Sequence, residues 1–224
     1  MQRVLVVDDD RDMLRLIQKV FGKYKDRFET ITASDGMEAV EVLKYNPVSL
    51  VLTDIQMPRL NGMMLLAYVH TYHPDIPCIV MTAYGTSRLK ERMPKDLLRF
   101  FQKQVEMKDL THAVLAALKR EGLQKKNRGI SIVSFFEMID MEKTSCIFEI
   151  KTKNNKTGIM YFEKGELFNA KVGELTGEAA ALELIGSEVK SYRFKSVPDK
   201  EIPRSIKTDI EVLVRNAIGD GLKD

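Results

Sequence analysis

Short apolar runs alternate with segments of helical periodicity through the first half of this chain, and polar or charged residues follow four of the runs. This alternation favours parallel strands joined by helices. The carboxyl ends of parallel strands meet at one edge of the sheet, where open α/β sheets carry their chemistry. The residues expected at that edge are Asp8 and Asp9 after VLVV, Asp54 after LVLT, Thr82 after CIVM and Lys103 after LLRFFQ.

The periodicities of the first half define five strand–helix units. They predict an α/β fold with a doubly wound, five-stranded parallel sheet. The expected strands lie near 3–7, 28–32, 50–53, 79–81 and 98–101, and the expected helices near 13–21, 35–44, 63–71 and 107–120. Segment 86–96 is polar and contains Pro94, so the helix expected there is short or irregular and is the weakest element.

Three carboxylates close to one lysine and one threonine predict a site for a divalent cation and a phosphoryl group. Carboxylates forced together raise one another's pKa unless a cation is bound. Mg²⁺ suits such a site because it combines one or two carboxylates with water and phosphoryl oxygens. Taken alone, the acids at 8–10 are typical of a helix N-cap or a solvated turn. Only their combination with Asp54 and Lys103 favours the cation site.

Length and charge limit the function classes. The 224 residues suit two small domains, each with a core of ordinary size. Residues 1–121 hold 18 Lys and Arg against 16 Asp and Glu, and residues 122–224 hold 17 against 16. Neither half has the strong basic excess typical of proteins that bind the phosphate backbone, which weighs against a nucleic-acid domain.

The apolar runs and the start of the chain indicate a cytoplasmic protein, and the cytoplasm is a compartment that keeps cysteines reduced. Every apolar run is shorter than the ~20 residues of a membrane span, and the start MQRVLVVDDD turns acidic too early for a secretory signal. Cys78 and Cys146 lie far apart in the sequence. We expect both to be free, buried thiols rather than a disulfide.

The second half has a different pattern, which predicts a smaller α+β domain with its own core. A helical pattern covers 133–141, and a turn at Lys164 and Gly165 predicts a hairpin. The remaining elements expected are strands at 146–150, 159–162, 167–170 and 192–194, a small-residue helix in GEAAALELIG and a closing amphipathic helix at 206–218. We therefore expect domains at 1–121 and 130–224, joined by a charged linker at 122–129.

Residues 1–121 resemble a response-regulator receiver domain of bacterial two-component signalling. The resemblance rests on VLVVDDD, LVLTDIQMPRLNG, CIVMTAYG and the position of Lys103, which occur in the order and spacing of that family. It implies a flavodoxin-like fold with strand order 2-1-3-4-5. It also implies a phosphoprotein that acts with a sensor histidine kinase and is not an enzyme, although slow self-dephosphorylation would be compatible.

The resemblance implies a role for each acid. Asp54 would be the phosphoacceptor, an ionised nucleophile that takes a phosphoryl group from the kinase. Asp8, Asp9 and Asp54 would hold Mg²⁺ together with the backbone carbonyl of Gln56. The cation and the nearby lysine would neutralise the charge that develops on the phosphoryl oxygens.

The resemblance also implies a switch built from Thr82, Lys103 and Phe100. Thr82 and Lys103 would bind the phosphoryl group, and Phe100 would change rotamer with Thr82. The signal would leave through the face of helix 86–96, strand 98–101 and helix 107–120, where a homodimer could also form. Read without the family, Thr82 is a helix N-cap, Phe100 a buried strand aromatic and Lys103 a surface lysine. Receivers usually have proline after this lysine, and Gln104 replaces it here.

Residues 130–224 resemble a PATAN-type domain, a module found attached to bacterial receivers. The resemblance rests on TGIMYFEKGELFNAKVGELTGEAAALELI and on SYRFKS. It implies protein interaction more than catalysis, and this half contains no histidine, no metal-spaced cysteines and no glycine-rich nucleotide loop. Met160 or Phe168 beside the hairpin would be candidate docking residues, with a core role for either left open.

Three functions remain open from the sequence. The first is a phosphorylation-controlled switch whose second domain docks another protein. The alternatives are a DNA-binding transcriptional regulator and an adaptor that does not need phosphorylation. A DNA-recognition helix would be rich in basic and amide side chains, and 206–218 offers only Lys207, Arg215 and Asn216.

Overall fold

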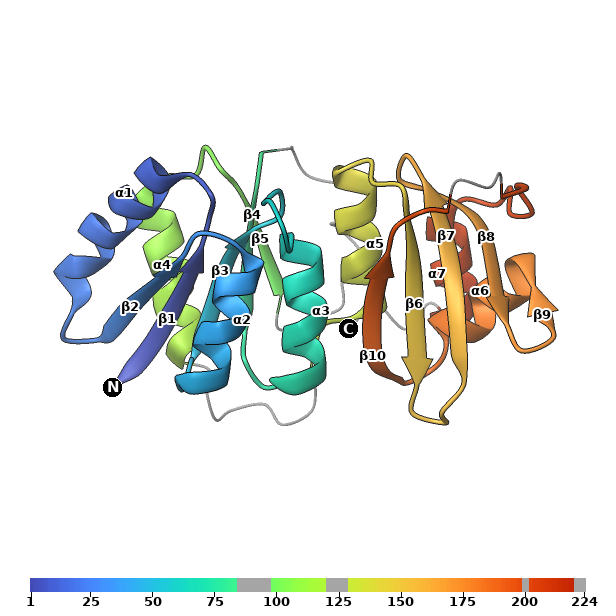
Figure 1. Ribbon diagram of the computed structural model, residues 1–224, viewed down its shortest axis with the longest axis horizontal. Coiled ribbons are helices and arrows are strands. Elements are labelled where there is room, and N and C mark those ends of the chain that lie inside the picture. Colours follow the sequence, from blue (N-terminus) through green and yellow to red (C-terminus); the bar gives the residue numbers. More distant parts are fainter. Residues whose placement is uncertain (84–97, 120–128, 199–201, 220–224) are drawn as a thin grey trace. The chain divides into compact units, whose positions relative to one another are not determined.

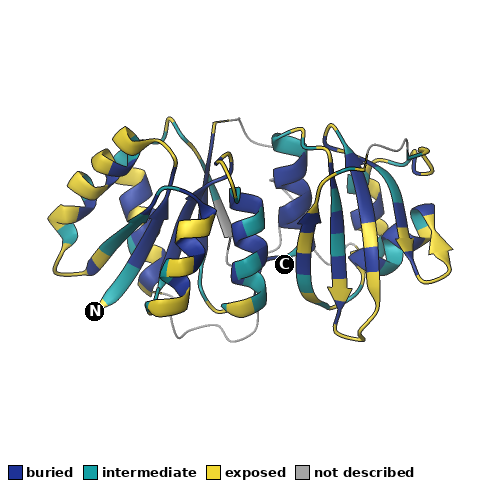
Figure 2. Cartoon of the chain, in the orientation of Figure 1, coloured by how far each residue is buried: buried dark blue, intermediate teal, exposed yellow. Residues whose placement is uncertain are grey.

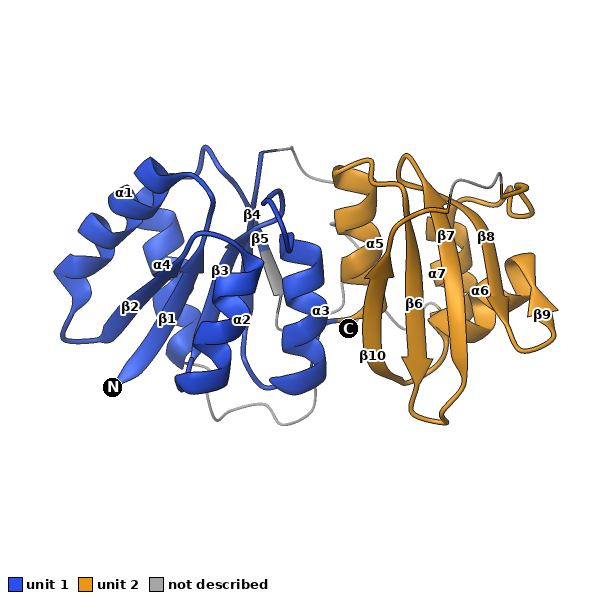
Figure 3. Cartoon of the chain, viewed as in Figure 1, with its two compact units in different colours: residues 1–85, 95–130 blue, residues 86–94, 131–224 orange. Residues whose placement is uncertain are grey.

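The computed structural model describes residues 1–83, 98–119, 129–198 and 202–219 (Figure 1). These residues form two compact units (Figure 3). The first comprises 1–83, 98–119 and 129–130, and the second comprises 131–198 and 202–219. The irregular helix expected at 86–96 and almost all of the expected linker lie outside the described residues.

The first unit contains the five-stranded, all-parallel sheet that the alternating pattern predicts. Its strand order is β2-β1-β3-β4-β5, which confirms the doubly wound α/β fold. The strands are β1 Gln2–Val7, β2 Phe28–Ala33, β3 Leu50–Asp54, β4 Cys78–Thr82 and β5 Leu98–Gln102. The helices are α1 Arg11–Phe21, the short 3₁₀ helix η1 Gly22–Tyr24, α2 Gly36–Tyr45, α3 Gly62–Tyr72 and α4 Met107–Lys119.

Helices cover both faces of this sheet. In Figure 1, α2 and α3 lie together on one face, and α1 and α4 lie together on the other. The central strands are therefore buried on both sides, and they read as continuous apolar runs instead of alternating ones. Strand β1, for example, has no exposed side chain from Val4 to Val7.

The second unit is an antiparallel sheet of order β10-β6-β7-β8-β9 with three helices, which confirms the expected second α+β domain. Its strands are β6 Cys146–Thr152, β7 Thr157–Glu163, β8 Glu166–Val172, β9 Leu175–Thr176 and β10 Val189–Lys195. Its helices are α5 Ile132–Met141, α6 Gly177–Ile185 and α7 Ile210–Ile218. An aromatic cluster joins α5 to the sheet, because the Phe135 ring lies 5.4 Å from Phe148 and 4.6 Å from Tyr192 between centroids.

The expected start of the closing helix is wrong. The closing helix begins at Ile210, because Asp209 caps it by accepting the Glu211 N–H at 2.8 Å. Ile206 instead lies in an extended segment beside β8 and donates its N–H to the Phe168 carbonyl at 3.0 Å. Met160 is fully buried, so of the two roles left open for it, docking and core, the structure confirms the core role.

The two cysteines are free and buried, as expected. Burial raises the pKa of the Cys146 thiol to about 12. Within the described ranges, every helix is too short or too polar to cross a membrane.

Residues 129–130 end the first unit by docking on α3. The Gly129 N–H donates to the Pro74 carbonyl at 2.8 Å. The next N–H, of Ile130, donates to Nδ1 of His70 at 3.0 Å. Burial lowers the pKa of His70 to about 4, so the imidazole is neutral and able to accept this hydrogen bond at neutral pH.

Candidate functional site

The fold brings the predicted acids together at the carboxyl edge of the first sheet. Asp8 and Asp9 directly follow β1, and Asp54 is the last residue of β3. Strands β1 and β3 are parallel neighbours, with Val7 opposite Thr53. Carboxylate oxygens of Asp8, Asp9 and Asp54 consequently lie within 4.8 Å of one another.

Burial and charge make these carboxylates costly to ionise. Asp8 and Asp54 are buried, whereas Asp9 is exposed. Burial raises the pKa of Asp8, and the Asp10 N–H and Lys103 oppose this effect. Burial likewise raises the pKa of Asp54, opposed mainly by Lys103, while the negative charge of Asp9 raises it further. A bound cation would relieve this cost, as expected for a hard-metal site.

Lys103 completes the cluster. Its Nζ lies 2.8 Å from Asp54 Oδ2 and 3.2 Å from Asp8 Oδ2. Burial acts to lower the pKa of Lys103, but its hydrogen bond and attraction to Asp54, together with Asp8, outweigh burial and raise the pKa. Lys103 is therefore a cation at neutral pH. It lies beside two carboxylates, in contrast to the surface-lysine interpretation.

The trans peptide bond after Lys103 does not displace its side chain from the cluster. Among the described residues no peptide bond is cis, so the Lys103–Gln104 bond is trans. The Lys103 N–H donates to the Thr82 carbonyl at 2.8 Å and fixes the start of the loop after β5. The absence of the usual proline therefore leaves the ammonium in reach of Asp54.

The other predicted residues lie on the neighbouring strands β4 and β5 and on the loop after β3. Thr82 is the last residue of β4, and only 2% of its surface is exposed. The residue before it, Met81, lies opposite Asp54 in the pairing of β3 with β4. Phe100 lies opposite Val80 in the β4–β5 register and is half-buried. Gln56 follows Asp54 by two residues and is exposed.

Asp10 has a different role from the two acids before it. Its side chain accepts the N–H groups of Asp12 at 2.8 Å and Met13 at 3.2 Å, and so caps α1. The N-cap interpretation of the acidic run is therefore correct for Asp10, while Asp8 and Asp9 face the cluster.

The loop between Asp54 and α3 is held by residues that sequence reasoning missed. Gly36 at the start of α2 donates its N–H to the Leu60 carbonyl at 3.0 Å, and Asp35 forms an ion pair with Arg59. A Cβ on Gly36 would lie 2.3 Å from the Leu60 oxygen, so only glycine allows this approach. The adjacent Asp-Gly pair is a turn signal that could have indicated a close backbone contact.

Gly62 closes the other end of the same loop. Its N–H donates to the Ile55 carbonyl at 2.9 Å, and a Cβ there would lie 2.0 Å from the Asp54 carbonyl oxygen. The first turn of α3 can therefore lie directly against the end of β3 only if this residue is glycine. Both ends of the Gln56 loop are thus fixed by backbone contacts.

The donor set fits a Mg²⁺ ion. All the convergent ligands are hard oxygens, the two buried carboxylates have raised pKa values, and Asp9 adds an exposed carboxylate on the open side. These are the ligands that Mg²⁺ prefers, and the exposed side leaves room for its water ligands.

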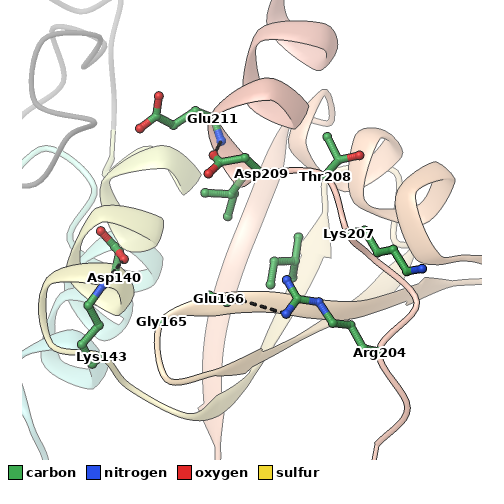
Figure 4. A pocket seen from close by; sticks show the side chains of 11 residues that line it. Asp140, Lys143, Gly165, Glu166, Arg204, Lys207, Thr208, Asp209 and Glu211 are labelled. Carbon is green, nitrogen blue, oxygen red and sulfur yellow. Dashed lines mark hydrogen bonds and ion pairs between the residues drawn. The ribbon is translucent and has the colours of Figure 1, made fainter.

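The second unit contains a cavity of about 390 Å³ between the end of α5, the start of β8 and the residues before α7 (Figure 4). Its wall contains two closed ion pairs, Arg204 with Glu166 at 3.0 Å and Lys143 with Asp140 at 2.6 Å. None of its lining residues is a histidine or a cysteine.

Comparisons with known proteins agree with this geometry. The response regulator receiver domain profile matches residues 4–115, which is half of the chain. The response regulator PilR of Pseudomonas aeruginosa is 32% identical over 53% of this chain, and the matched part spans 26% of PilR. Sporulation initiation phosphotransferase F of Bacillus subtilis is 28% identical over 50% of this chain and 90% of its own length.

Two further matches differ in extent. A probable transcriptional regulator, ycf27 of Pyropia yezoensis, is 28% identical over 81% of this chain and 75% of its own length. A solved receiver domain from Clostridium thermocellum is 28% identical and covers 55% of this chain and 98% of its own, with a TM-score of 0.47. From its profile match, this chain belongs to the response regulator receiver domain family of two-component signalling.

Proposed function

We propose that this protein is a two-component response regulator in which Asp54 accepts a phosphoryl group from a sensor histidine kinase. Kinase partners and Mg²⁺ at an acidic pocket are general for receiver domains. The observation that carries the proposal is the convergence of Asp8, Asp9 and Lys103 on Asp54 at the end of β3. In the proposed assignment Asp8, Asp9, Asp54 and the Gln56 carbonyl hold Mg²⁺.

Each side chain has one task in the transfer. An oxygen of the Asp54 carboxylate attacks phosphorus as the bond to the kinase histidine breaks, and that histidine leaves as an imidazole. Bound Mg²⁺ supplies charge neutralisation for the phosphoryl oxygens. Lys103 moves from the Asp54 carboxylate to a phosphoryl oxygen, and its raised pKa keeps it cationic during the step. Asp8 and Asp54 are buried, which limits the access of bulk water to the acceptor carboxylate.

Thr82 and Phe100 form the proposed route out of the site. A phosphoryl oxygen offers the Thr82 hydroxyl a new partner, and movement of Thr82 frees space for the Phe100 ring. Phe100 is half-buried on the edge strand β5, so its ring can exchange between two environments without opening the core. The face around β5 and α4 is therefore the proposed signalling and dimerisation surface.

We propose that the second unit is a PATAN-like interaction domain for another protein. The near balance of 17 basic and 16 acidic residues in the second half supports a protein partner. The mixed charges of α7 also fit poorly with a recognition helix. The domain division at 1–121, 122–129 and 130–224 stays a prediction.

The DNA-binding alternative has one observation in its favour. The match to the probable transcriptional regulator ycf27 extends over 81% of this chain and so reaches the second unit. Titration of the full chain with random and genomic duplex DNA at physiological salt distinguishes a DNA-binding from a protein-binding second unit. Sequence-dependent binding in the ~10⁻⁸–10⁻¹¹ M range of specific regulators would favour DNA. Absence of such binding is the result we expect.

The adaptor alternative is tested by phosphorylation itself. Incubation with acetyl phosphate and Mg²⁺, followed by intact-mass measurement, should add one phosphoryl group to the wild-type chain. An adaptor that does not depend on phosphorylation would show the same hydrogen exchange with and without beryllofluoride and Mg²⁺. We expect beryllofluoride with Mg²⁺ to change hydrogen exchange in β5 and α4.

A further inference from the structure

One face of the second sheet has no helix over it among the described residues of this unit. Helices α5 and α6 pack on the opposite face, where Phe135 contacts Phe148 and Leu184 lies against Gly158. Helix α7 contacts α6 on that covered side. Figure 1 shows the open side of the strands β10, β6, β7 and β8 in front of α6 and α7.

The strand register defines which side chains stand on this open side, which we call the outer face. Lys195 is opposite Ile147, Arg193 is opposite Glu149, and Ile159 is opposite both Glu149 and Lys171. Buried residues alternate with these positions along β6, as Figure 2 shows. The outer face is defined by Ile147, Glu149, Lys151, Ile159, Lys171, Arg193 and Lys195.

The outer face carries more positive charge than the unit as a whole. Glu149 is the central acid, and it pairs with both Lys195 and Arg193, the latter at 3.6 Å between Arg193 Nη1 and Glu149 Oε1. Lys151 and Lys171 are exposed and have no acidic partner in the described part of the chain. Glu163 stands apart at the hairpin end. Four cations thus face one shared carboxylate in the middle of the sheet.

An exposed aliphatic side chain lies between these charges. Ile159 is 36% exposed on β7, in register with Glu149 on one side and Lys171 on the other. A single exposed isoleucine is ordinary on a protein surface. It lies at the centre of this basic face, which no helix among the described residues of the unit covers, and so offers an apolar contact inside a polar rim, as protein interfaces do.

The aromatic residues of the outer side argue against single-stranded nucleic acid as the occupant. Sheets that bind bases present open aromatic rings for stacking. Here Tyr161 is only 8% exposed. The Phe168 ring is covered by the Arg204 guanidinium, 4.6 Å from its centroid, and meets Tyr161 edge-on at 6.0 Å. No stacking platform is therefore available among these residues.

We propose that the outer face is the docking surface of the second unit and that it binds an acidic segment of a protein partner. The segment places an aliphatic side chain on Ile159, and its carboxylates meet Lys151, Lys171 and Arg193. Charge complementarity sets the orientation and speeds association, while the apolar contact adds affinity. This inference rests on the proposed role of the second unit as a protein-interaction domain.

The test uses the full chain, labelled with ¹⁵N, and a short acetylated peptide of alternating glutamate and leucine. We expect the peptide to shift the amides of β6, β7 and β10 at outer-face positions, with an affinity that falls as salt is raised. A peptide of alternating glutamine and leucine should bind at least about tenfold more weakly. Oligothymidylate should not compete with the acidic peptide.

Charge reversal gives the decisive comparison. The double variant Lys171→Glu, Arg193→Glu should weaken peptide binding at least about tenfold. Arg215→Glu on α7, an exposed site on the covered side, is the matched control and should leave the affinity unchanged. Circular dichroism verifies that both variants are folded.

The outcomes separate this inference from the function on which it rests. Absence of peptide binding, or equal weakening by Arg215→Glu, overturns the outer-face assignment. Shifts confined to another surface of the second unit overturn the assignment but leave a protein-interaction role standing. Tight oligothymidylate or duplex binding at the outer face overturns both. Phosphorylation of Asp54 should be normal in every variant, since these residues lie in the second unit.

Discussion

Lys103 Nζ lies 2.8 Å from Asp54 Oδ2 although the peptide bond that follows Lys103 is trans. The hydrogen bond from the Lys103 N–H to the Thr82 carbonyl positions the residue before the chain reaches Gln104. The ammonium thus depends on the β4–β5 pairing for its place. This ion pair links the proposed phosphoacceptor to the edge strand of the sheet.

Replacing Lys103 tests the value of that ion pair. Lys103→Met should slow phosphorylation of Asp54 by acetyl phosphate about 10- to 100-fold, because a charge-assisted hydrogen bond of about 1.5–3 kcal/mol to the transferring group is lost. Lys103→Arg should restore the rate only in part, since the planar guanidinium differs in shape from the ammonium. Intact-mass time courses measure the rates. A methionine variant as fast as wild type would remove Lys103 from the transfer.

Asp9 should destabilise the metal-free protein while it strengthens Mg²⁺ binding. Its charge helps to raise the pKa of Asp54. The pKa of the Asp54 carboxyl is higher in the folded protein than its value of 3.8 in the unfolded chain. The free energy of unfolding therefore falls as pH rises from 3.8 through the folded pKa. Asp9→Asn should therefore raise the metal-free unfolding free energy at pH 7 by up to about 1 kcal/mol, and weaken Mg²⁺ binding.

Urea unfolding with and without Mg²⁺ measures both effects of Asp9→Asn. The Mg²⁺-induced gain in stability should be smaller in the variant than in wild type. If the variant were less stable than wild type without metal and bound Mg²⁺ equally well, the assignment of Asp9 to the cation site would be wrong.

The close contact of Gly36 with Leu60 predicts a severe effect for a single added methyl group. Gly36→Ala places a carbon 2.3 Å from the Leu60 carbonyl oxygen, which should destabilise the fold by about 1–3 kcal/mol. Gly22→Ala is the matched control, because nothing lies within 4 Å of a Cβ there and its φ is −57°. Chemical denaturation of both variants compares them directly. Equal stabilities would show that the loop after Asp54 is not held at Leu60.

The buried imidazole of His70 predicts a pH dependence of stability. Its folded pKa of about 4 lies below the unfolded value of 6.5, so the folded state binds fewer protons between these values. The contribution of neutral His70 to the free energy of unfolding is fully present above pH 6.5 and is lost as pH falls toward 4. The slope is at most about 1.4 kcal/mol per pH unit.

His70→Asn separates the titration from the hydrogen bond. The asparagine carbonyl can still accept the Ile130 N–H but cannot be protonated in this range. Urea midpoints at pH 7 and pH 5 should therefore differ less in the variant than in wild type. A pH dependence that is identical in the two proteins would assign it to other groups.

The receiver fold and the core of its site were predictable from sequence because strand ends specify them. Asp8, Asp9 and Asp54 follow buried runs, and Lys103 follows the apolar run of β5. Parallel strands bring such positions together whichever loops connect them. For Asp35 and Gly36 the Asp-Gly pair indicates a turn, but the partners Arg59 and Leu60 were not predictable, because the two segments share no periodic pattern. Nor was the start of α7, where the apolar Ile206 fits a helical pattern but is buried beside β8.

In the second half, the alternation of apolar and polar residues located the strands, but it did not show which residues of each strand face the solvent. Met160 and Ile159 are neighbours on β7, and a shift of one residue exchanges core for surface. The register with β6 and β8 determines that Met160 is buried and Ile159 is exposed. That register depends on three strands at once, so no single strand's sequence reveals it.

Phosphorylation of wild type and Asp54→Asn by acetyl phosphate with Mg²⁺ tests the central claim most directly. The intact mass of the wild-type chain should increase by one phosphoryl group, and peptide mapping should place that group on Asp54. The asparagine variant and the magnesium-free reaction should show no increase. Undiminished labelling of Asp54→Asn would contradict the assignment of Asp54 as the phosphoacceptor.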